Sequence, residues 1–360
     1  MRKNKIRYLI KREIKSFFEL KQSERLWHIP VLASLCVGIP LFIGIYLNRL
    51  DYGLISCSSG LVILYLPSTS VANRMITLVA CSFGLMVSFT IGIVFSFNHL
   101  LSALILGLFA FGANWVTNYF QLKPPGNFFF IMLASIASCT PFDLMTIPTR
   151  VGLVGLGTML ACVLAFFYSL YIVKRYPPKA EVVIEKKNKY ASVTESVIIG
   201  AFLGLSLYIA HLLRLENPYW VPISCAAVIQ GVSLRHVWQR SFHRIVGTYI
   251  GLFLTWLLLL LNMTPLGICF SVLILQFIIE IVVVRQYALA VIFITPLTIF
   301  LAEAGRAMTV DPNILISTRF LDIVLGSLIG AVGGWFLHHQ QLHYHAERRI
   351  RKTRVAILRW

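Results

Sequence analysis

Charged residues are scarce in this chain, and acidic residues are the scarcest. Only 13% of the 360 residues are charged, with 14 Asp and Glu against 32 Lys and Arg, whereas 58% are hydrophobic. A soluble domain of this length cannot bury so large an apolar fraction in its core. The composition therefore argues against a soluble protein and predicts an all-α polytopic membrane protein.

Motifs for enzymatic chemistry are also missing. The chain has no P-loop, no HExxH and no GxSxG, which argues against an ATPase, a zinc protease and a serine hydrolase. Its seven cysteines lie within apolar segments and form no CxxC pair, so neither a disulfide framework nor a metal cluster is predicted. We therefore expect a protein that is not an enzyme and that uses no cofactor.

The basic residues are not spread as they would be on a nucleic-acid-binding surface. They gather in the flanks and short loops between apolar runs, which is the orientation signal of inserted helices. With twelve spans and a cytoplasmic N-terminus, all but five of the 32 Lys and Arg lie inside, the exceptions being Arg49, Arg150, Arg214, Arg306 and Arg319. We expect a multi-pass protein of the plasma membrane with both termini in the cytoplasm and no nucleic-acid partner.

The sequence of the first half returns in the second. The matching features are the segments 52–57 and 219–225, Arg74 and Arg244, Thr140-Pro141 and Thr295-Pro296, and Arg150 and Arg319. In the last pair, a glycine and a hydroxyl residue follow seven and eight places after the arginine. Six spans per copy is an even number, so the pattern predicts two parallel six-helix transmembrane repeats, about twelve spans in all. Each of the two Thr-Pro pairs is predicted to end a span.

The predicted organisation has five segments. A basic amphipathic segment at 1–28 precedes the first repeat at 29–173, a cytoplasmic linker occupies 174–192, the second repeat covers 193–337, and a basic tail follows at 338–360. Basic segments beside a bilayer attract anionic lipid, which is therefore a predicted partner.

Three or four of the twelve predicted spans are short, and two of them are notable. Residues 52–67 and 220–233 fall below the roughly 17–25 residues that cross a bilayer, and they hold the same place in each copy. Matched short segments in the two halves of a repeat point to a substrate site.

The strongest candidate for substrate binding is a basic stretch after the second of these segments. Arg235, Arg240 and Arg244 follow one another there, and Arg240 and Arg244 are spaced to share one helix face. Guanidinium groups bind carboxylates through two parallel hydrogen bonds, so these residues would collect an anion. The alternative is that they are ordinary cytoplasmic flanking charges. Arg74 is a weaker candidate of the same kind.

Ionisable residues at other places in the spans are further candidates. Arg150 and Arg319 recur on the outer side, where insertion does not favour positive charge; Arg319 either serves the pathway or pairs with Asp322. Glu280 either exchanges a proton during transport or pairs with Arg285 at the interface. Glu280 and Asp322 are thus the candidates for proton coupling, and no metal ligands are predicted.

Taken together, these features resemble a known family of transporters. They are Tyr219-Trp220, the stretch 239–244, Gly247-Thr248, Gly251, Arg319, Asp322, Gly326-Ser327 and Gly330. They resemble the fusaric acid resistance protein-like family of aromatic acid exporters, and the six-helix unit is also similar to that of plant aluminium-activated malate transporters. The resemblance implies export of small organic anions, such as aromatic carboxylic acids like fusaric acid, through a cavity between the repeats.

Two other functions remain open at this point. A passive anion channel of the malate-transporter type would need no proton-coupling residue. A membrane scaffold or a subunit of a larger assembly would use the basic termini to hold lipid or a partner. The expected partners are accordingly a small organic anion, anionic lipid, and either further copies of this chain or an accessory export subunit.

Overall fold

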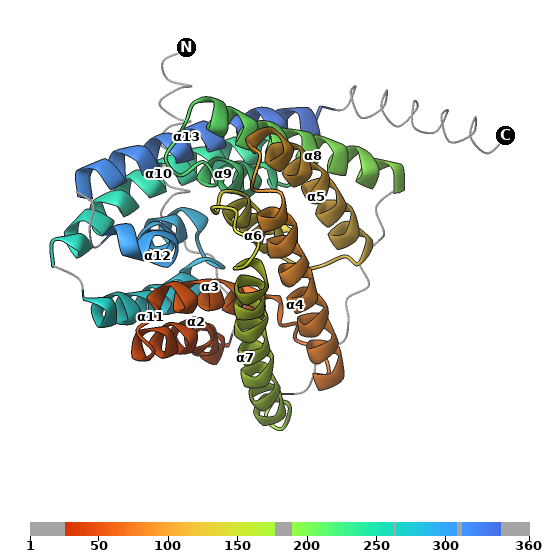
Figure 1. Cartoon of the computed structure of the whole chain (residues 1–360). Coiled ribbons are helices and arrows are strands. Elements are labelled where there is room, and N and C mark those ends of the chain that lie inside the picture. The colour runs from red at the N-terminus through yellow and green to blue at the C-terminus, as the bar shows by residue number, and fades with distance from the viewer. Residues whose placement is uncertain (1–25, 177–188, 262–263, 308–311, 340–360) are drawn as a thin grey trace, which may run out of the picture.

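The computed structural model describes residues 26–176, 189–261, 264–307 and 312–339 (Figure 1). Most of the predicted N-terminal segment, linker and tail therefore lies outside the described residues. Where the chain is described, its regular structure is helical, with twelve α-helices and one short 3-10 helix.

The helices fall into two successive groups. The first group comprises α2 (His28–Tyr46), α3 (Leu50–Gly60), η1 (Leu61–Tyr65), α4 (Val71–Val94), α5 (His99–Tyr119), α6 (Phe128–Ser138) and α7 (Ile147–Val173). The second comprises α8 (Lys189–Leu212), α9 (Trp220–Ile229), α10 (Leu234–Leu259), α11 (Pro265–Val282), α12 (Tyr287–Ala307) and α13 (Pro312–Leu337).

Eight of the described helices are long and apolar enough to cross a membrane: α2, α4, α5, α7, α8, α10, α11 and α13. The protein is therefore an all-helical, multi-pass membrane protein, as the composition predicted. The other four predicted spans coincide with shorter apolar helices, which are α3 with η1, α6, α9 and the first part of α12. They hold the second and fifth places in each group.

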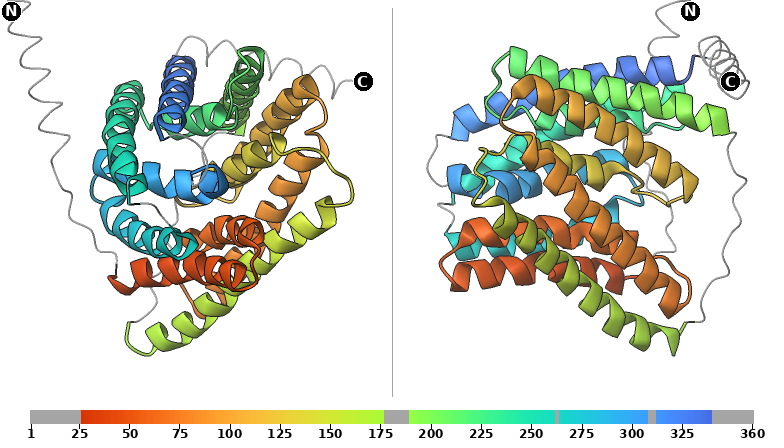
Figure 2. Two further views of the ribbon diagram at one scale, coloured as in Figure 1. Left: turned by 60° about the vertical axis from the view of Figure 1, so that its left-hand side comes forward. Right: turned by 45° about the vertical axis from the view of Figure 1, so that its right-hand side comes forward.

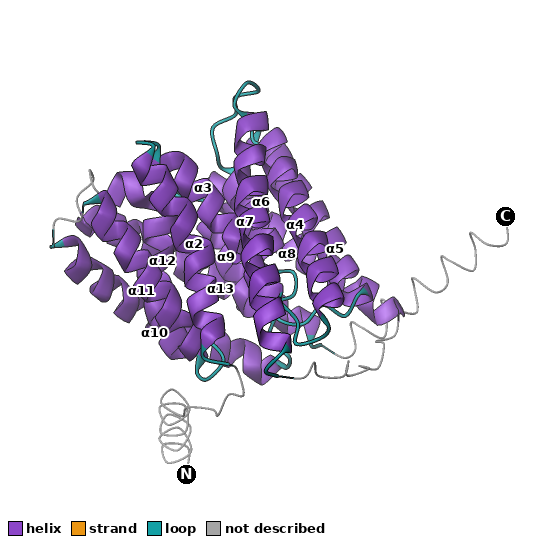
Figure 3. Ribbon diagram, turned by 90° about the horizontal axis from the view of Figure 1, so that it is seen from below, coloured by secondary structure: helices purple, strands orange, loops and turns teal. Residues whose placement is uncertain are grey.

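The short helices lie inside a wall of longer ones (Figure 2). Every one of the ten residues of α9 is buried, and eight of the eleven residues of α6 are buried. Seen from below, α4, α5 and α6 lie on one side of the molecule and α10, α11 and α12 on the other (Figure 3).

The two groups use the same pairs of neighbours. In the first group α3 packs on α7, and α4 packs on both α6 and α7; in the second, α9 packs on α13, and α10 packs on both α12 and α13. The groups join at two seams, where α5 packs on α8 and α2 packs on α11. The second and fifth helices of each group are thus held by its third and sixth.

The recurring glycines of the sequence lie where a short helix meets a long one. A Cβ atom at Gly157 would overlap the carbonyl oxygen of Ser56 in α3, and one at Gly326 would overlap the carbonyl oxygen of Val221 in α9. Only glycine permits so close an approach of two helix backbones. The repeat in the sequence therefore reflects a repeated packing requirement.

One predicted helix end is wrong. Pro141 lies beyond the end of α6, but Pro296 lies inside α12, which continues to Ala307. A proline within a helix leaves the carbonyl four residues earlier without its N–H donor. Here that carbonyl belongs to Ile292, and it lies so close to Gly251 of α10 that a Cβ there would be 2.6 Å from the oxygen. The carbonyl oxygen that Pro296 leaves without a donor thus faces the backbone of α10.

The seam between α5 and α8 is built from small residues. A Cβ at Gly107 would lie 2.9 Å from the carbonyl oxygen of Gly200, and one at Gly204 would lie 2.9 Å from that of Ala103. Membrane helices associate through such small-residue contacts because lipid offers no hydrophobic driving force between them.

Substitution Gly107→Leu should open this seam, whereas Gly112→Leu in the same helix should not. Gly112 has nothing within 4 Å of a built Cβ, so the control adds the same side chain without a clash. We expect Gly107→Leu to lower the free energy of unfolding by about 1–3 kcal/mol. Thermal unfolding of the purified protein in detergent measures this, and equal midpoints for the two variants would contradict the packing.

Candidate functional site

A cavity of about 1980 Å³ lies among the short helices. Its lining includes residues from all four of them and from the long helices around them. The charged lining residues are six arginines and three carboxylates: Arg49, Arg74, Arg150, Arg240, Arg244, Arg319, Asp51, Glu195 and Glu280. A cavity with this excess of positive charge and low-dielectric walls attracts anions.

Arg319 is the most deeply buried of these arginines. Only 1% of it is exposed, and its guanidinium carbon lies 3.0 Å from the centre of the Trp220 ring. Its Nη2 donates a hydrogen bond of 2.8 Å to the hydroxyl of Thr298 in α12. The ring face and the hydroxyl offset part of the cost of burying the charge.

Arg244 contacts the same short helix one turn further on. It extends from α10 and its Nη2 donates to the hydroxyl of Ser224 at 3.2 Å. Since Ser224 follows Trp220 by four residues, the two arginines touch points on α9 about 6 Å apart along its axis. The Nε of Arg244 is buried without a hydrogen-bond partner among the described residues.

Arg240 lies one turn before Arg244 on α10. Its guanidinium lies 4.7 Å from the ring centre of Tyr287, the first residue of α12, and the Tyr287 hydroxyl faces both arginines. The Nε of Arg240 is also buried without a partner among the described residues. Two guanidinium groups and a phenol hydroxyl thus converge at the start of a short helix.

Two arginines of the first group also line the cavity. The Nε of Arg74 donates to the carbonyl oxygen of Thr69 at 2.9 Å, and the residue is 6% exposed. The Nη1 of Arg150 is buried without a hydrogen-bond partner in the described part of the chain. Arg150 and Arg319 both lie seven residues before the glycine that meets a short helix, Gly157 or Gly326. Arg74 is the fourth residue of α4, whereas Arg244 is the eleventh residue of α10.

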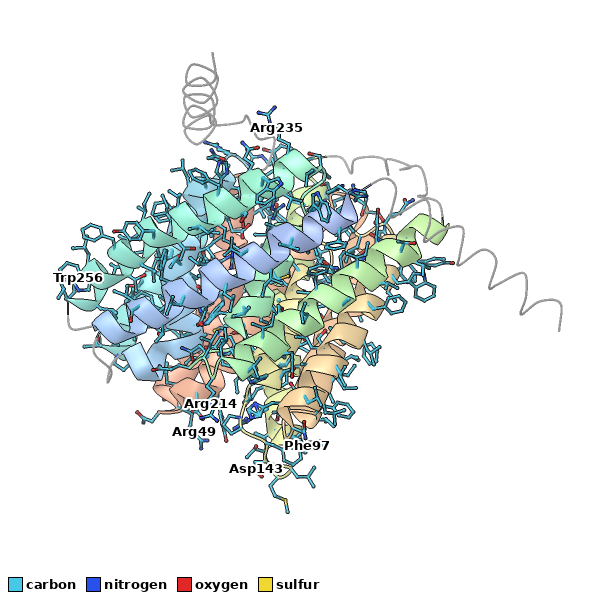
Figure 4. All side chains as sticks on the ribbon, turned by 90° about the horizontal axis from the view of Figure 1, so that it is seen from above. Arg49, Phe97, Asp143, Arg214, Arg235 and Trp256 are labelled. Atoms are coloured by element: carbon cyan, nitrogen blue, oxygen red, sulfur yellow. The ribbon has the colours of Figure 1, made fainter. Side chains whose placement is uncertain are left out.

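The remaining candidates divide between the cavity and its surroundings. Glu280 lines the cavity, is 2% exposed and accepts a hydrogen bond of 3.1 Å from the side-chain amide of Gln276. Asp322 is 1% exposed but lies outside the cavity lining, one turn after Arg319. Arg235 is exposed in the first turn of α10 and points away from the cavity (Figure 4).

A chain of polar side chains escaped the sequence analysis. Asn114 donates to the Ser196 hydroxyl at 2.9 Å, Asn127 donates to the Asn114 carbonyl oxygen at 2.9 Å, and Gln230 donates to Asn127. These residues belong to α5, α8, α6 and α9 or their ends, so the chain crosses from one helix group to the other. The sequence did contain one signal for this chain of side chains, which is the amide of Asn114 inside a long apolar run.

Asn114 and Glu280 occupy the same place in corresponding helices. Each lies fifteen residues after the first residue of its helix, α5 for Asn114 and α11 for Glu280. Both are buried at a seam between the groups, one as an amide and the other as a carboxylate. At this position the first group therefore has a side chain that cannot titrate, and the second group has one that can.

Comparison with known proteins matches the second helix group. Residues 201–333 match the fusaric acid resistance protein-like family. The match covers 133 of the 360 residues, so the similarity is to this part of the chain. This part contains Arg240, Arg244, Glu280 and Arg319 and therefore most of the candidate site.

One curated relative is an uncharacterized membrane protein, YvaC of Bacillus subtilis (strain 168). It is 32% identical over 138 residues, which are 37% of this chain and 22% of the relative. The chain thus matches about a fifth of that protein's length. No solved structure matches the chain.

The contact between Arg319 and Trp220 should matter for the stability of the second helix group. Trp220→Leu removes the ring face and leaves a buried guanidinium group poorly compensated, at a cost of about 2 kcal/mol or more. Trp220→Phe keeps a ring and should lose less. The matched control is Trp238→Leu, because Trp238 is 52% exposed. In thermal unfolding in detergent, the midpoint should be highest for the parent and should then fall in the order Trp238→Leu, Trp220→Phe and Trp220→Leu. Equal midpoints for the two leucine variants would contradict the prediction.

Proposed function

We propose that this protein exports small organic anions, and aromatic carboxylic acids in particular, through the arginine-lined cavity. The observation that carries the proposal is the convergence of Arg240, Arg244 and Tyr287, with guanidinium nitrogens that lack hydrogen-bond partners among the described residues. Guanidinium groups with free donors bind a carboxylate well. The cavity is larger than the ~300–1,000 Å³ of a typical ligand pocket, as suits a pathway.

The two helix groups are, in this proposal, two parallel six-helix repeats at residues 29–173 and 193–337. The matched neighbour pairs and the matched short helices support this division. Substrate sites of repeat transporters lie where the repeats meet and where helices are broken. A cavity lined by all four short helices fits that rule.

The orientation follows the charge distribution. Arg235 lies at one end of the molecule, while Arg49 and Arg214 lie at the opposite end (Figure 4). This agrees with a cytoplasmic face at Arg235. In this proposal the protein lies in the plasma membrane, and both termini are in the cytoplasm. The anion would then enter beside Arg240 and Arg244 and leave beside Arg150 and Arg319.

The aromatic side chains favour an aromatic substrate. Trp220 and Tyr287 both line the cavity next to arginines, so a ring and a carboxylate could be held together. Fusaric acid, after which the matched family is named, is a carboxylic acid with an aromatic ring. Each arginine should bind weakly enough to release the anion to the next.

Arg244→Gln should reduce the efflux of fusaric acid from loaded proteoliposomes about tenfold, the equivalent of about 1.4 kcal/mol in binding. Arg244→Lys keeps the charge and should lose less. Arg175→Gln serves as the matched control, because Arg175 is exposed and lies outside the cavity lining. Efflux is compared at equal protein density, and parent-like efflux in Arg244→Gln would refute the anion pathway.

Proton coupling through Glu280 would make the protein a carrier and not a passive channel. Its burial and its position on the cavity wall support a carboxyl group that changes protonation as the anion passes. Without coupling, the same cavity would serve as an anion channel. Glu280→Gln distinguishes the two, because glutamine resembles the protonated carboxyl group and cannot titrate.

In a carrier, Glu280→Gln should abolish uphill export driven by a pH gradient while downhill exchange continues. If Glu280 instead pairs with Arg285, Glu280→Gln should lower the amount of folded protein, and Glu280→Gln/Arg285→Gln should restore it. Transport into liposomes is measured with the gradient imposed and then collapsed. Uphill transport at the parent rate in Glu280→Gln would remove the residue from the mechanism and favour the channel.

A further inference from the structure

Two histidines meet at one end of the seam between the helix groups. His99 is the first residue of α5, and His211 lies one residue before the end of α8. Their Nδ1 atoms are 2.9 Å apart, and their rings meet edge to face at 87° with centres 4.3 Å apart. His99 lies two residues after Phe97, and His211 lies three residues before Arg214. Phe97 and Arg214 lie at the end of the molecule that is the outer one in the proposed orientation (Figure 4).

The geometry brings the two Nδ1 atoms within hydrogen-bond distance of each other. A hydrogen bond between two Nδ1 atoms uses a single proton, which one imidazole donates and the other accepts. A metal ion can take the place of that proton, since neutral imidazole nitrogen is a common ligand of Zn²⁺. Two Zn–N bonds of about 2.0–2.1 Å at a tetrahedral angle place the nitrogens roughly 3.3 Å apart. The rings need to separate by only about 0.4 Å to reach that distance.

We propose that His99 and His211 bind one divalent transition-metal ion of the Zn²⁺ class through their Nδ1 atoms. His99 is exposed, so water can complete the coordination shell. No third His, Cys, Asp or Glu joins them in the described part of the chain, so the site has two protein ligands. It is therefore an exchangeable site and not a closed structural one.

The ion would join the two helix groups. Between α5 and α8 the seam is otherwise held by the contacts of Gly107 with Gly200 and Gly204 and by the hydrogen bond from Asn114 to Ser196. A metal bridge from His99 to His211 would clamp the remaining end. Metal binding does not depend on the proposed transport activity, so the two proposals can fail separately.

The test is a Zn²⁺ titration of the purified full chain in detergent, in competition with a chromophoric chelator. Tail histidines could also bind metal, so the background carries His339→Gln, His343→Gln and His345→Gln. We expect one equivalent of Zn²⁺ in this background. His99→Gln and His211→Gln should each weaken Zn²⁺ binding by about tenfold or more. Removing a group that only hydrogen-bonds to a metal ligand already costs about tenfold in affinity, and removing the ligand itself should cost at least that much. His28→Gln, remote in sequence and bonded to Tyr168, is the matched control and should bind like the background.

A second measurement guards against variants that do not fold. Zn²⁺ should raise the thermal unfolding midpoint of the background protein and of His28→Gln, but not that of His99→Gln or His211→Gln. All four proteins should elute as the same species without metal. Unchanged Zn²⁺ affinity in both His99→Gln and His211→Gln, or the absence of a bound equivalent in the background protein, would overturn the proposal.

Discussion

Three helices too short to cross a bilayer, α3, α6 and α9, and a fourth that contains Pro296, α12, impose the main constraint on this fold. Ten residues of α9 extend only about 15 Å, whereas the hydrocarbon core is about 30 Å thick. The ends of such a helix carry backbone N–H and C=O groups that lipid cannot satisfy, so protein must surround them. The eight long helices provide that wall, and the cavity lies among the helices that they surround.

A long helix can pack closely against a short one only where the contacting residue has no side chain. Gly157 and Gly326 allow α7 and α13 to approach α3 and α9 at backbone distance, and Gly251 allows α10 to lie against the carbonyl that Pro296 leaves without a donor. These glycines belong to the long helices, but the short helix α3 makes the same adjustment, since a Cβ atom at its Gly60 would overlap the carbonyl oxygen of Cys36 in α2.

The charges in the cavity are tolerated because protein groups replace water around them. Arg319 has the Trp220 ring and the Thr298 hydroxyl, and Arg244 has the Ser224 hydroxyl. These three contacts are with neutral groups, which do not cancel the positive field of a guanidinium group.

The sequence by itself determined the membrane class, the matched short helices, the recurring glycines and most of the arginines of the cavity. These features depend on composition and on spacing along a helix, which are local properties. Tertiary structure alone decided that Arg235 lies outside the cavity while Arg240 lies within it, that Trp220 faces Arg319, and that α12 continues past Pro296. It also decided the polar chain through Asn114 and the meeting of His99 with His211. Each of these contacts joins helices whose alignment is set by packing across a seam, and hydropathy indicates that a helix is buried without indicating which helix lies beside it.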